Sequence, residues 1–240
     1  MNSQHEFVLR TVEERDIRFI RLWFTDILGA LKSVVMSPSE LESAFEEGVG
    51  FDGSSIEGFS RISESDTLAL PDPSTFQIMP FDQDDPDIIS ARMFCDIAQP
   101  DGQPSMVDPR HILRRQVTES ANEGFTCMAA PEIEFYLLEQ SLDNTNLIAT
   151  DNGGYFDQAT HDRAPSFRRR AMSALEAMSI ATEFSHHETA PGQQEIDLRH
   201  ADVMTMADNI MTFRHVIKQV AADQKVQATF MPKPVSYTHL

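Results

Sequence analysis

Residues 100–104, with the sequence PDGQP, place two prolines and a glycine within five positions and divide the chain into two differently patterned parts. Before this break, apolar and polar residues alternate in short stretches that are typical of strands, at 17–24, 30–36, 76–81 and 88–96. One helix is predicted among them, with Ser37 as its N-cap, Pro38 in its first turn and Gly48 at its end. The stretch 48–60 shows no periodicity. The first part therefore predicts a small α+β domain built on a curled sheet.

The second part of the chain carries longer predicted elements. Three helices are expected, each opened by an N-cap side chain: Asp108 for 109–122, Ser166 for a helix to 179, and Asp202 for a helix to 224. Strands are predicted between and after these helices, at 125–139, 180–188, 195–198 and 226–231. The arginines at 168–170 are predicted to lie on the solvated face of their helix, with contact of one arginine to a phosphate as the alternative.

The charge balance excludes several function classes. Lys and Arg number 19 against 38 Asp and Glu, a formal net charge of −19, which argues against nucleic-acid binding because that affinity depends on clustered cations. No apolar run approaches the length of roughly 18 residues needed to cross a bilayer. The N-terminus lacks a signal-peptide pattern, and two cysteines form no spaced framework. We therefore expect an acidic, soluble, cytoplasmic protein.

The sharpest local motif is PEIEF at 131–135. Residues two apart in a strand share a face, so Glu132 and Glu134 project together while Ile133 and Phe135 point to the core. Like charges held side by side are unfavourable unless a cation neutralises them. The motif alone is compatible with a metal site or with the solvated edge of an amphipathic strand.

A second acidic cluster lies at HHETAPGQQE, residues 186–195. Glu188 ends one predicted strand and Glu195 follows the turn, so the two carboxylates can converge across it. Carboxylate oxygens are the preferred ligands of Mg²⁺ and Mn²⁺. Adjacent strand residues face opposite ways, so at most one of His186 and His187 can join these ligands, and a core position is the alternative for each.

A third motif, FDGSSIEGF at 51–59, combines glycines and serines with an acid. The glycines and serines supply exposed backbone N–H groups and tolerate unusual dihedral angles. Asp52 could accept a proton or hold a cationic substrate there. An ordinary capped surface loop is the alternative.

In this order and spacing, these three motifs and FMPKP at 230–234 resemble bacterial type I glutamine synthetase. The resemblance runs from about residue 15 to 234. It implies an α+β fold, with a β-grasp-like N-terminal domain over 15–98 followed by the first part of the α/β catalytic domain over 104–234. Residues 235–240 (VSYTHL) match nothing in the family pattern.

The resemblance also implies a reaction, its cofactors and its partners. The family joins glutamate and ammonium with ATP, through γ-glutamyl phosphate, using Mg²⁺ or Mn²⁺. By motif position, Glu134, Glu188 and Glu195 hold the first metal ion, and Glu132 contributes to the second. The family assembles homododecamers of two stacked hexameric rings, with each active site between two neighbouring subunits.

Three further residues take roles by motif position. Asp52 matches the aspartate that binds ammonium in the neighbouring subunit's site and takes its proton. Glu183 matches a position that contacts ATP, and Arg61 matches one that takes part in feedback inhibition by glutamine.

The family pattern continues beyond FMPKP into a Gly-Ser-Gly-x-His segment that this sequence does not contain, so we expect residues 1–240 alone to be inactive. Two alternatives stay open: a related ligase that uses a polyamine as acceptor, and a non-catalytic glutamine-synthetase-like scaffold. The Asp52 motif favours ammonia, and the four glutamates, which are costly without a metal, favour an enzyme.

Overall fold

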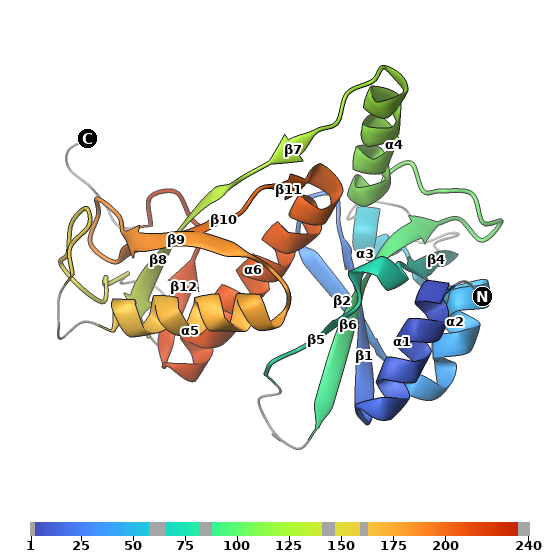
Figure 1. Ribbon diagram of the computed structural model, residues 1–240, viewed down its shortest axis with the longest axis horizontal. Helices are drawn as coiled ribbons and strands as arrows, with labels where there is room; N and C mark the ends of the chain where they lie inside the picture. The colour runs from blue at the N-terminus through green and yellow to red at the C-terminus, as the bar shows by residue number, and fades with distance from the viewer. Residues whose placement is uncertain (1–2, 58–65, 82–87, 141–146, 159–162, 235–240) are drawn as a thin grey trace. The chain divides into compact units, whose positions relative to one another are not determined.

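The computed structural model describes residues 3–57, 66–81, 88–140, 147–158 and 163–234 (Figure 1). The chain divides into two compact units, Met1–Cys127 and Met128–Leu240, which are described separately. No helix among the described residues is both long and apolar enough to span a membrane.

A six-stranded sheet forms the centre of the first unit. Its strands run in the order β2-β1-β6-β4-β3, and β5 also pairs with β6. β1 and β6 are parallel, whereas β1–β2, β4–β6 and β3–β4 are antiparallel. The strands are β1 (Ile17–Thr25), β2 (Leu31–Met36), β3 (Val49–Asp52), β4 (Asp66–Pro71), β5 (Gln77–Ile78) and β6 (Ile89–Ala98).

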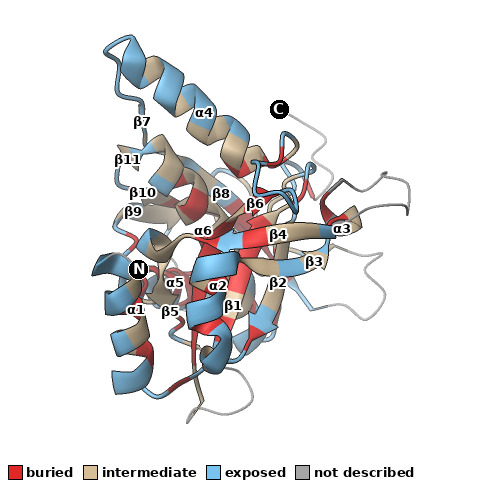
Figure 2. Cartoon of the chain, turned by 90° about the vertical axis from the view of Figure 1, so that its right-hand side faces the viewer, coloured by how far each residue is buried: buried red, intermediate tan, exposed pale blue. Residues whose placement is uncertain are grey.

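Two helices close the core of this unit. Val8 and Val12 of α1 and Leu41 of α2 share one buried cluster with Ile20 and Leu22 of β1. Figure 2 shows this arrangement as buried strands with helices whose outer surfaces are exposed. The helices and helical turns are α1 (Ser3–Glu14), η1 (Pro38–Glu40), α2 (Leu41–Glu47), α3 (Ser54–Glu57), η2 (Pro73–Thr75) and α4 (Pro109–Asn122).

The first unit differs from the sequence-based expectation in several places. Strand β4 (Asp66–Pro71) was not predicted, and of the predicted strand 76–81 only Gln77–Ile78 forms β5. The predicted helix from Pro38 is divided into η1 and α2, and the Ser37 side chain makes no capping hydrogen bond, although the helix does end at Gly48 with φ 77°. The stretch 48–60, expected to lack regular structure, contains β3 and α3. Helix α1 was not predicted. Its only buried residues are Val8 and Val12, and this narrow apolar stripe is buried by packing against the sheet.

Helix α4 begins where the sequence predicts. The Asp108 carboxylate accepts hydrogen bonds from the N–H of Arg110 at 3.0 Å and from the N–H of Ile97 at 2.9 Å. One side chain therefore caps the helix and ties its first turn to the end of β6.

The second unit contains a four-stranded antiparallel sheet with two helices on one face. The strand order is β12-β8-β10-β9, and β7 pairs separately with β11. Phe135 of β8 contacts Phe167 of α5 and Phe213 of α6, with ring centroids 5.7 Å and 6.2 Å apart. The opposite face of β8 carries the glutamates. The elements are β7 (Met128–Ala129), β8 (Glu132–Glu139), α5 (Ala164–Ala177), β9 (Thr182–His187), β10 (Gln193–Leu198), β11 (Ala201–Asp202), α6 (Val203–Asp223) and β12 (Val226–Thr229).

Several details of this unit confirm or correct the sequence analysis. Asp202 caps α6 as predicted, accepting hydrogen bonds from two backbone N–H groups. The predicted strand 125–139 is divided into β7 and β8. Helix α5 begins at Ala164 rather than after Ser166, because Pro165 takes a first-turn position.

Arg168 is a correction, since the sequence places it on a solvated helix face. Its side chain is buried, with the residue only 8% exposed, and its guanidinium donates a hydrogen bond to Gln194 Oε1 on β10. Arg169 and Arg170 are exposed as predicted. Arg168 follows Phe167 on the face that α5 packs against the sheet, and the polar acceptor on β10 makes its burial possible.

Candidate metal centre

Strands β8 and β10 align four carboxylates on the face of the sheet opposite the helices. Glu195 lies opposite Glu134 in the antiparallel register, and Asp197 lies opposite Glu132. Directly opposed residues in an antiparallel pair project from the same face with their side chains close together. The local alternation of each strand and the pairing between them thus produce one acidic patch.

The turn between β9 and β10 adds a fifth carboxylate, that of Glu188. Its N–H donates to the carbonyl oxygen of Gln193 at 2.8 Å, which closes the turn. Its carboxylate accepts hydrogen bonds from the N–H and the hydroxyl of Thr189 at 2.9 Å and 3.1 Å. One oxygen each from Glu134, Glu188 and Glu195 lies within 4.8 Å of the others. The convergence predicted across the turn is therefore confirmed.

His186 adjoins the same carboxylates. It lies opposite Glu195 in the β9–β10 pairing, with its Nε2 3.6 Å from Glu195 Oε1 and its Nδ1 3.7 Å from Glu188 Oε1. His186, Glu195 and Asp197 form a second group whose possible ligand atoms lie within 4.8 Å of one another. His187 points to the opposite face, as the alternation predicts.

The carboxylates of the patch repel one another, and this repulsion acts on a buried member of the group. Burial raises the pKa of Glu195 to about 8, reinforced by a hydrogen bond and charge repulsion from Asp197 and by repulsion from Glu188 and Glu134. Asp197 Oδ1 is buried and has no hydrogen-bond partner among the described residues. Converging carboxylate oxygens with an unsatisfied buried acceptor fit a hard divalent cation such as Mg²⁺ or Mn²⁺.

Gln193 fixes the orientation of one of these glutamates. Its amide Nε2 donates a hydrogen bond to Glu134 Oε2 at 2.7 Å, and its Oε1 accepts one from the N–H of Ala190 at 3.1 Å. The residue is buried. Gln193 therefore links the turn that carries Glu188 to a carboxylate on the neighbouring strand.

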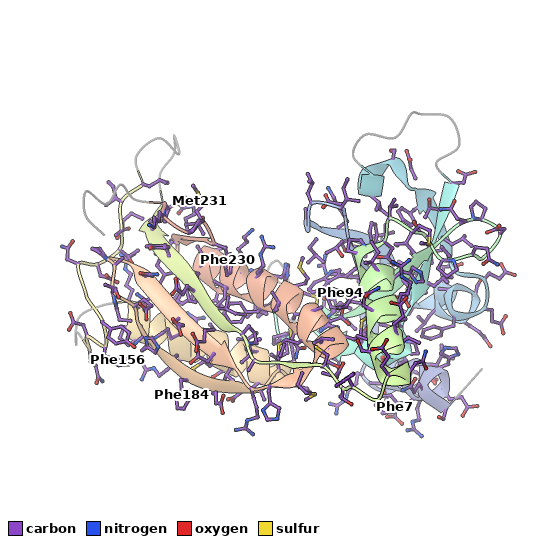
Figure 3. The ribbon with its side chains drawn as sticks, turned by 90° about the horizontal axis from the view of Figure 1, so that it is seen from above. Phe7, Phe94, Phe156, Phe184, Phe230 and Met231 are labelled. Carbon is purple, nitrogen blue, oxygen red and sulfur yellow. The ribbon has the colours of Figure 1, made fainter. Side chains whose placement is uncertain are left out.

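Aromatic rings border the acidic patch on the β9 side. The rings of Tyr155 and Phe156 lie 5.6 Å and 4.7 Å from the His186 ring, both in edge-to-face geometry. Both aromatic residues are exposed, as is Phe184 on β9. Figure 3 labels Phe156 and Phe184. Phe156 adopts φ 61°, which is uncommon for a bulky residue, and its N–H donates to the His187 carbonyl oxygen at 3.0 Å. The segment around Phe156 is thus fastened to the strand that carries His186.

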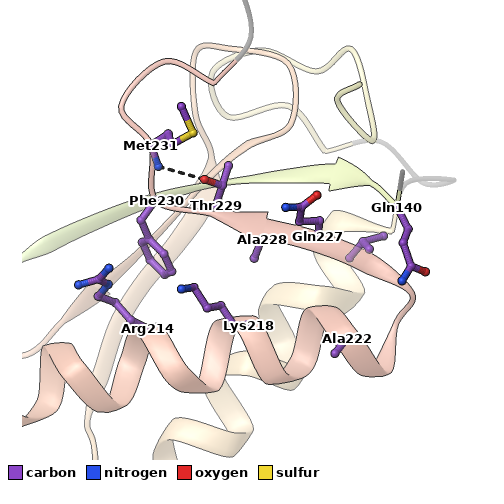
Figure 4. A pocket seen from close by; sticks show the side chains of 10 residues that line it. Gln140, Arg214, Lys218, Ala222, Gln227, Ala228, Thr229, Phe230 and Met231 are labelled. Atoms are coloured by element: carbon purple, nitrogen blue, oxygen red, sulfur yellow. Dashed lines mark hydrogen bonds between the residues drawn. The ribbon is translucent and has the colours of Figure 1, made fainter. Parts of the chain in front are cut away.

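A separate open cavity of about 720 Å³ runs along β12 and α6 (Figure 4). Arg214 and Lys218 of α6 line it together with Gln227 and Phe230. None of the clustered carboxylates contributes to its lining. The acidic patch is therefore distinct from this cavity.

Comparison with known families identifies two successive domains, whose boundary at 100–106 precedes the division between the two compact units at Cys127 and Met128. Residues 16–100 match the family model described as glutamine synthetase, beta-Grasp domain. Residues 106–239 match the model described as glutamine synthetase, catalytic domain. The chain belongs to the glutamine synthetase family. The expected α+β fold, with a β-grasp domain followed by part of the catalytic domain, is confirmed.

Named relatives are similar along almost the whole chain. Glutamine synthetase of Mycolicibacterium smegmatis is 65% identical over 235 residues, which are 98% of this chain and 53% of the relative. Glutamine synthetase of Thermus thermophilus is 44% identical over 231 residues, which are 95% of this chain and 52% of the relative. The chain spans about half the length of the curated relatives it matches.

A solved glutamine synthetase has the same fold. The cryo-EM structure of the Plasmodium falciparum enzyme superimposes with a TM-score of 0.85 at 25% sequence identity, covering 98% of this chain and 51% of that one.

The remaining predicted site residues of this glutamine synthetase homologue do not join the close group of Glu134, Glu188 and Glu195, and one of them lies outside the described residues. Glu132 and Glu183 are exposed, on β8 and β9, and belong to neither close group of possible ligand atoms found among the described residues. Asp52 is exposed at the end of β3 in the first unit, where its Oδ1 accepts a hydrogen bond from the N–H of Ser54 at 3.0 Å. Arg61 lies outside the described residues.

Sequence reasoning missed Gln193, Asp197 and Tyr155. For Gln193 and Asp197 a signal exists, because both lie two positions from Glu195 and so share its face of the strand. Tyr155 follows two glycines in a segment without periodicity, and only the folded chain places its ring beside His186.

Proposed function

We propose that the complete protein to which this chain belongs is a glutamate–ammonia ligase that uses ATP and forms glutamine through γ-glutamyl phosphate. The observation that carries the proposal is the convergence of Glu134, Glu188 and Glu195. Such a site suits phosphoryl transfer, which requires that the charge of the transferred group be neutralised and its position fixed.

The roles proposed for the acidic residues are those that their motif positions within the family imply. Glu134, Glu188 and Glu195 hold one divalent ion, Mg²⁺ or Mn²⁺, and Glu132 contributes to a second. When bound, these ions supply charge neutralisation at the phosphates of ATP. Gln193 and Thr189 orient two of the carboxylates through the hydrogen bonds described above.

Residues outside the cluster complete the proposed site. Asp52 binds ammonium and accepts its proton, since ammonium is not nucleophilic until it loses one. Glu183 contacts the nucleotide, and Arg61 takes part in feedback inhibition by glutamine. These three assignments rest on motif position within a family that is now established for the chain.

The proposal extends to organisation and location. We assign 15–98 to the β-grasp domain and 104–234 to the catalytic domain, with support from the family-model bounds at 100 and 106. The expected tail at 235–240 has no such support, because the match to the catalytic-domain model extends to residue 239. A homododecamer in the cytoplasm is the expected assembly, and the free Cys95 and Cys127 suit a reducing compartment.

The deciding experiment is Mn²⁺ titration calorimetry on the complete protein, with turnover measured in parallel. Glu134→Ala should abolish glutamine formation and raise the Mn²⁺ dissociation constant by at least about tenfold. Glu139→Ala is the matched control, because Glu139 is an exposed glutamate of the same strand that belongs to neither close acidic group. Unchanged Mn²⁺ affinity and turnover in Glu134→Ala would refute the proposed site.

The identity of the amine substrate is tested on the same complete protein. With ATP and glutamate supplied, ammonia should be consumed in preference to polyamines. Preferential consumption of a polyamine would assign the chain to the alternative ligase, and failure of all amines with normal Mn²⁺ binding would favour the non-catalytic alternative.

A further inference from the structure

A buried acid–histidine pair lies behind the carboxylate patch, on the helix-facing side of the sheet. The side chains of Asp151 and His187 are only 2% and 3% exposed. His187 Nε2 lies 2.9 Å from Asp151 Oδ1, and His187 Nδ1 lies 2.6 Å from the carbonyl oxygen of Glu188. His187 therefore connects a carboxylate from a distant loop to the backbone of a proposed metal ligand.

Asp151 also holds the other end of the same turn. Its Oδ1 accepts a hydrogen bond from the N–H of Gly192 at 2.7 Å, in addition to one from the N–H of Gly153 at 3.1 Å. The turn begins at Glu188 and ends at Gly192, immediately before β10. A single carboxylate thus fixes both ends of the segment that sets the distance between Glu188 and Glu195.

The surroundings leave the turn little freedom to adopt another shape. Gly192 has φ 72°, and a Cβ at this position would lie 2.7 Å from the carbonyl oxygen of Leu137. A Cβ on Gly153 would lie 2.6 Å from His187 Nε2. Both glycines therefore permit close approaches that bring backbone N–H groups to Asp151.

The neighbouring polar groups belong to the same buried network. Gln194 Nε2 lies 3.5 Å from Asp151 Oδ2, and the Arg168 guanidinium donates to Gln194 Oε1. Arg168 also interacts electrostatically with Asp151. The Asp151 carboxylate therefore has a cationic neighbour and several donors, which stabilise a charge at a buried position.

We propose that Asp151 and His187 are positioning residues for the metal centre. They fix the 188–192 turn so that the Glu188 carboxylate stands beside that of Glu195 at the distance a divalent ion requires. The inference rests on the proposed function of the carboxylate patch. Neither residue would contact the ion, since both lie on the opposite face of the sheet.

The test is titration of the metal-free complete protein with Mn²⁺ alone, followed by the paramagnetic enhancement of water-proton relaxation. Asp151→Ala should raise the Mn²⁺ dissociation constant by about tenfold or more, as is typical when an outer partner of a metal site is removed. His187→Gln, which loses the bridge to the Glu188 carbonyl oxygen, should weaken binding in the same direction. If Asp151→Ala does not fold, His187→Gln decides the question alone.

Two controls separate the possible outcomes. Asp202→Ala also removes a carboxylate that accepts two backbone N–H hydrogen bonds in the same unit, but far from the turn, and it should lower thermal stability without changing Mn²⁺ affinity. Glu195→Gln tests the metal site itself. One outcome would overturn the positioning role alone. In that outcome Glu195→Gln loses Mn²⁺ binding, but the folded Asp151 and His187 variants bind Mn²⁺ with an affinity within twofold of the parent. Unchanged binding in Glu195→Gln would overturn the proposed metal site. An equal loss in Asp202→Ala would attribute the effect to general destabilisation and also overturn the positioning role.

Discussion

Glu134 and Glu195 are direct cross-strand partners in the β8–β10 pairing, and their side chains share the face of the sheet that the helices leave uncovered. Two opposed carboxylates of which one is 7% exposed are unfavourable in isolation. The opposed carboxylates therefore favour the binding of a cation between them. Their effect on stability can be measured in the presence and absence of metal.

The stability of the protein should depend on pH through the buried carboxyl group of Glu195. The pKa of Glu195 is raised from 4.5 to about 8 in the folded protein, so the folded state binds a proton more tightly than the unfolded state. The free energy of unfolding of the metal-free protein should therefore fall as pH rises from about 4.5 to about 8. Urea denaturation at pH 5, 6.5 and 8 measures this slope, which Glu195→Gln should flatten. A slope that is identical in Glu195→Gln would contradict the assignment.

Truncation of Arg168 should destabilise the protein far more than truncation of Arg169. Arg168→Ala removes a buried donor from Gln194 Oε1 and should lower the free energy of unfolding by about 3 kcal/mol. Arg169→Ala, at the adjacent exposed position of α5, should change it by less than about 0.5 kcal/mol. Chemical denaturation of both variants provides the comparison. Equal effects would mean that the burial of Arg168 has no energetic significance.

Two glycines with positive φ differ in their surroundings. Gly102→Ala places a Cβ in open space at φ 83° and should cost about 1 kcal/mol for the left-handed conformation. Gly192→Ala at φ 72° adds a clash with the Leu137 carbonyl oxygen and should cost about 3 kcal/mol. Urea denaturation measures both losses. A Gly192→Ala variant as stable as Gly102→Ala would show that the turn can relax around the added methyl group.

Asp52 should be needed for the ammonium step. Asp52→Asn keeps an oxygen that can accept the Ser54 N–H hydrogen bond but removes the negative charge and the base. Glutamine synthesis by the complete protein should fall by at least about a hundredfold while ATP binding persists.

Asp66→Asn is the matched control for that substitution, because Asp66 is the exposed cross-strand partner of Asp52 on β4. Its activity should stay near that of the parent. Near-normal synthesis by Asp52→Asn, or an equal loss of ATP binding, would contradict the role assigned to Asp52.

The strongest sequence predictions concern features that nearest neighbours determine. Asp108 and Asp202 identify helix starts because a capping side chain acts on N–H groups two or three positions away. The alternation in PEIEF places Glu132 and Glu134 on one face because the strand period is two. The separation of His186 from His187 follows from the same period. These features required no knowledge of the rest of the fold.

Only the tertiary structure decided which distant groups meet. Three such contacts depend on strands and loops far apart in the chain. They are the pairing of Glu134 with Glu195, the hydrogen bond from Gln193 to Glu134, and the contact of Asp151 with His187 across 36 positions. The same holds for the burial of Arg168 and for helix α1, whose short apolar stripe is defined by the sheet it covers. Local periodicity assigns a side chain to a face, but the partner on that face is chosen by packing and pairing over the whole unit, because those contacts are formed between residues with no local relation in sequence.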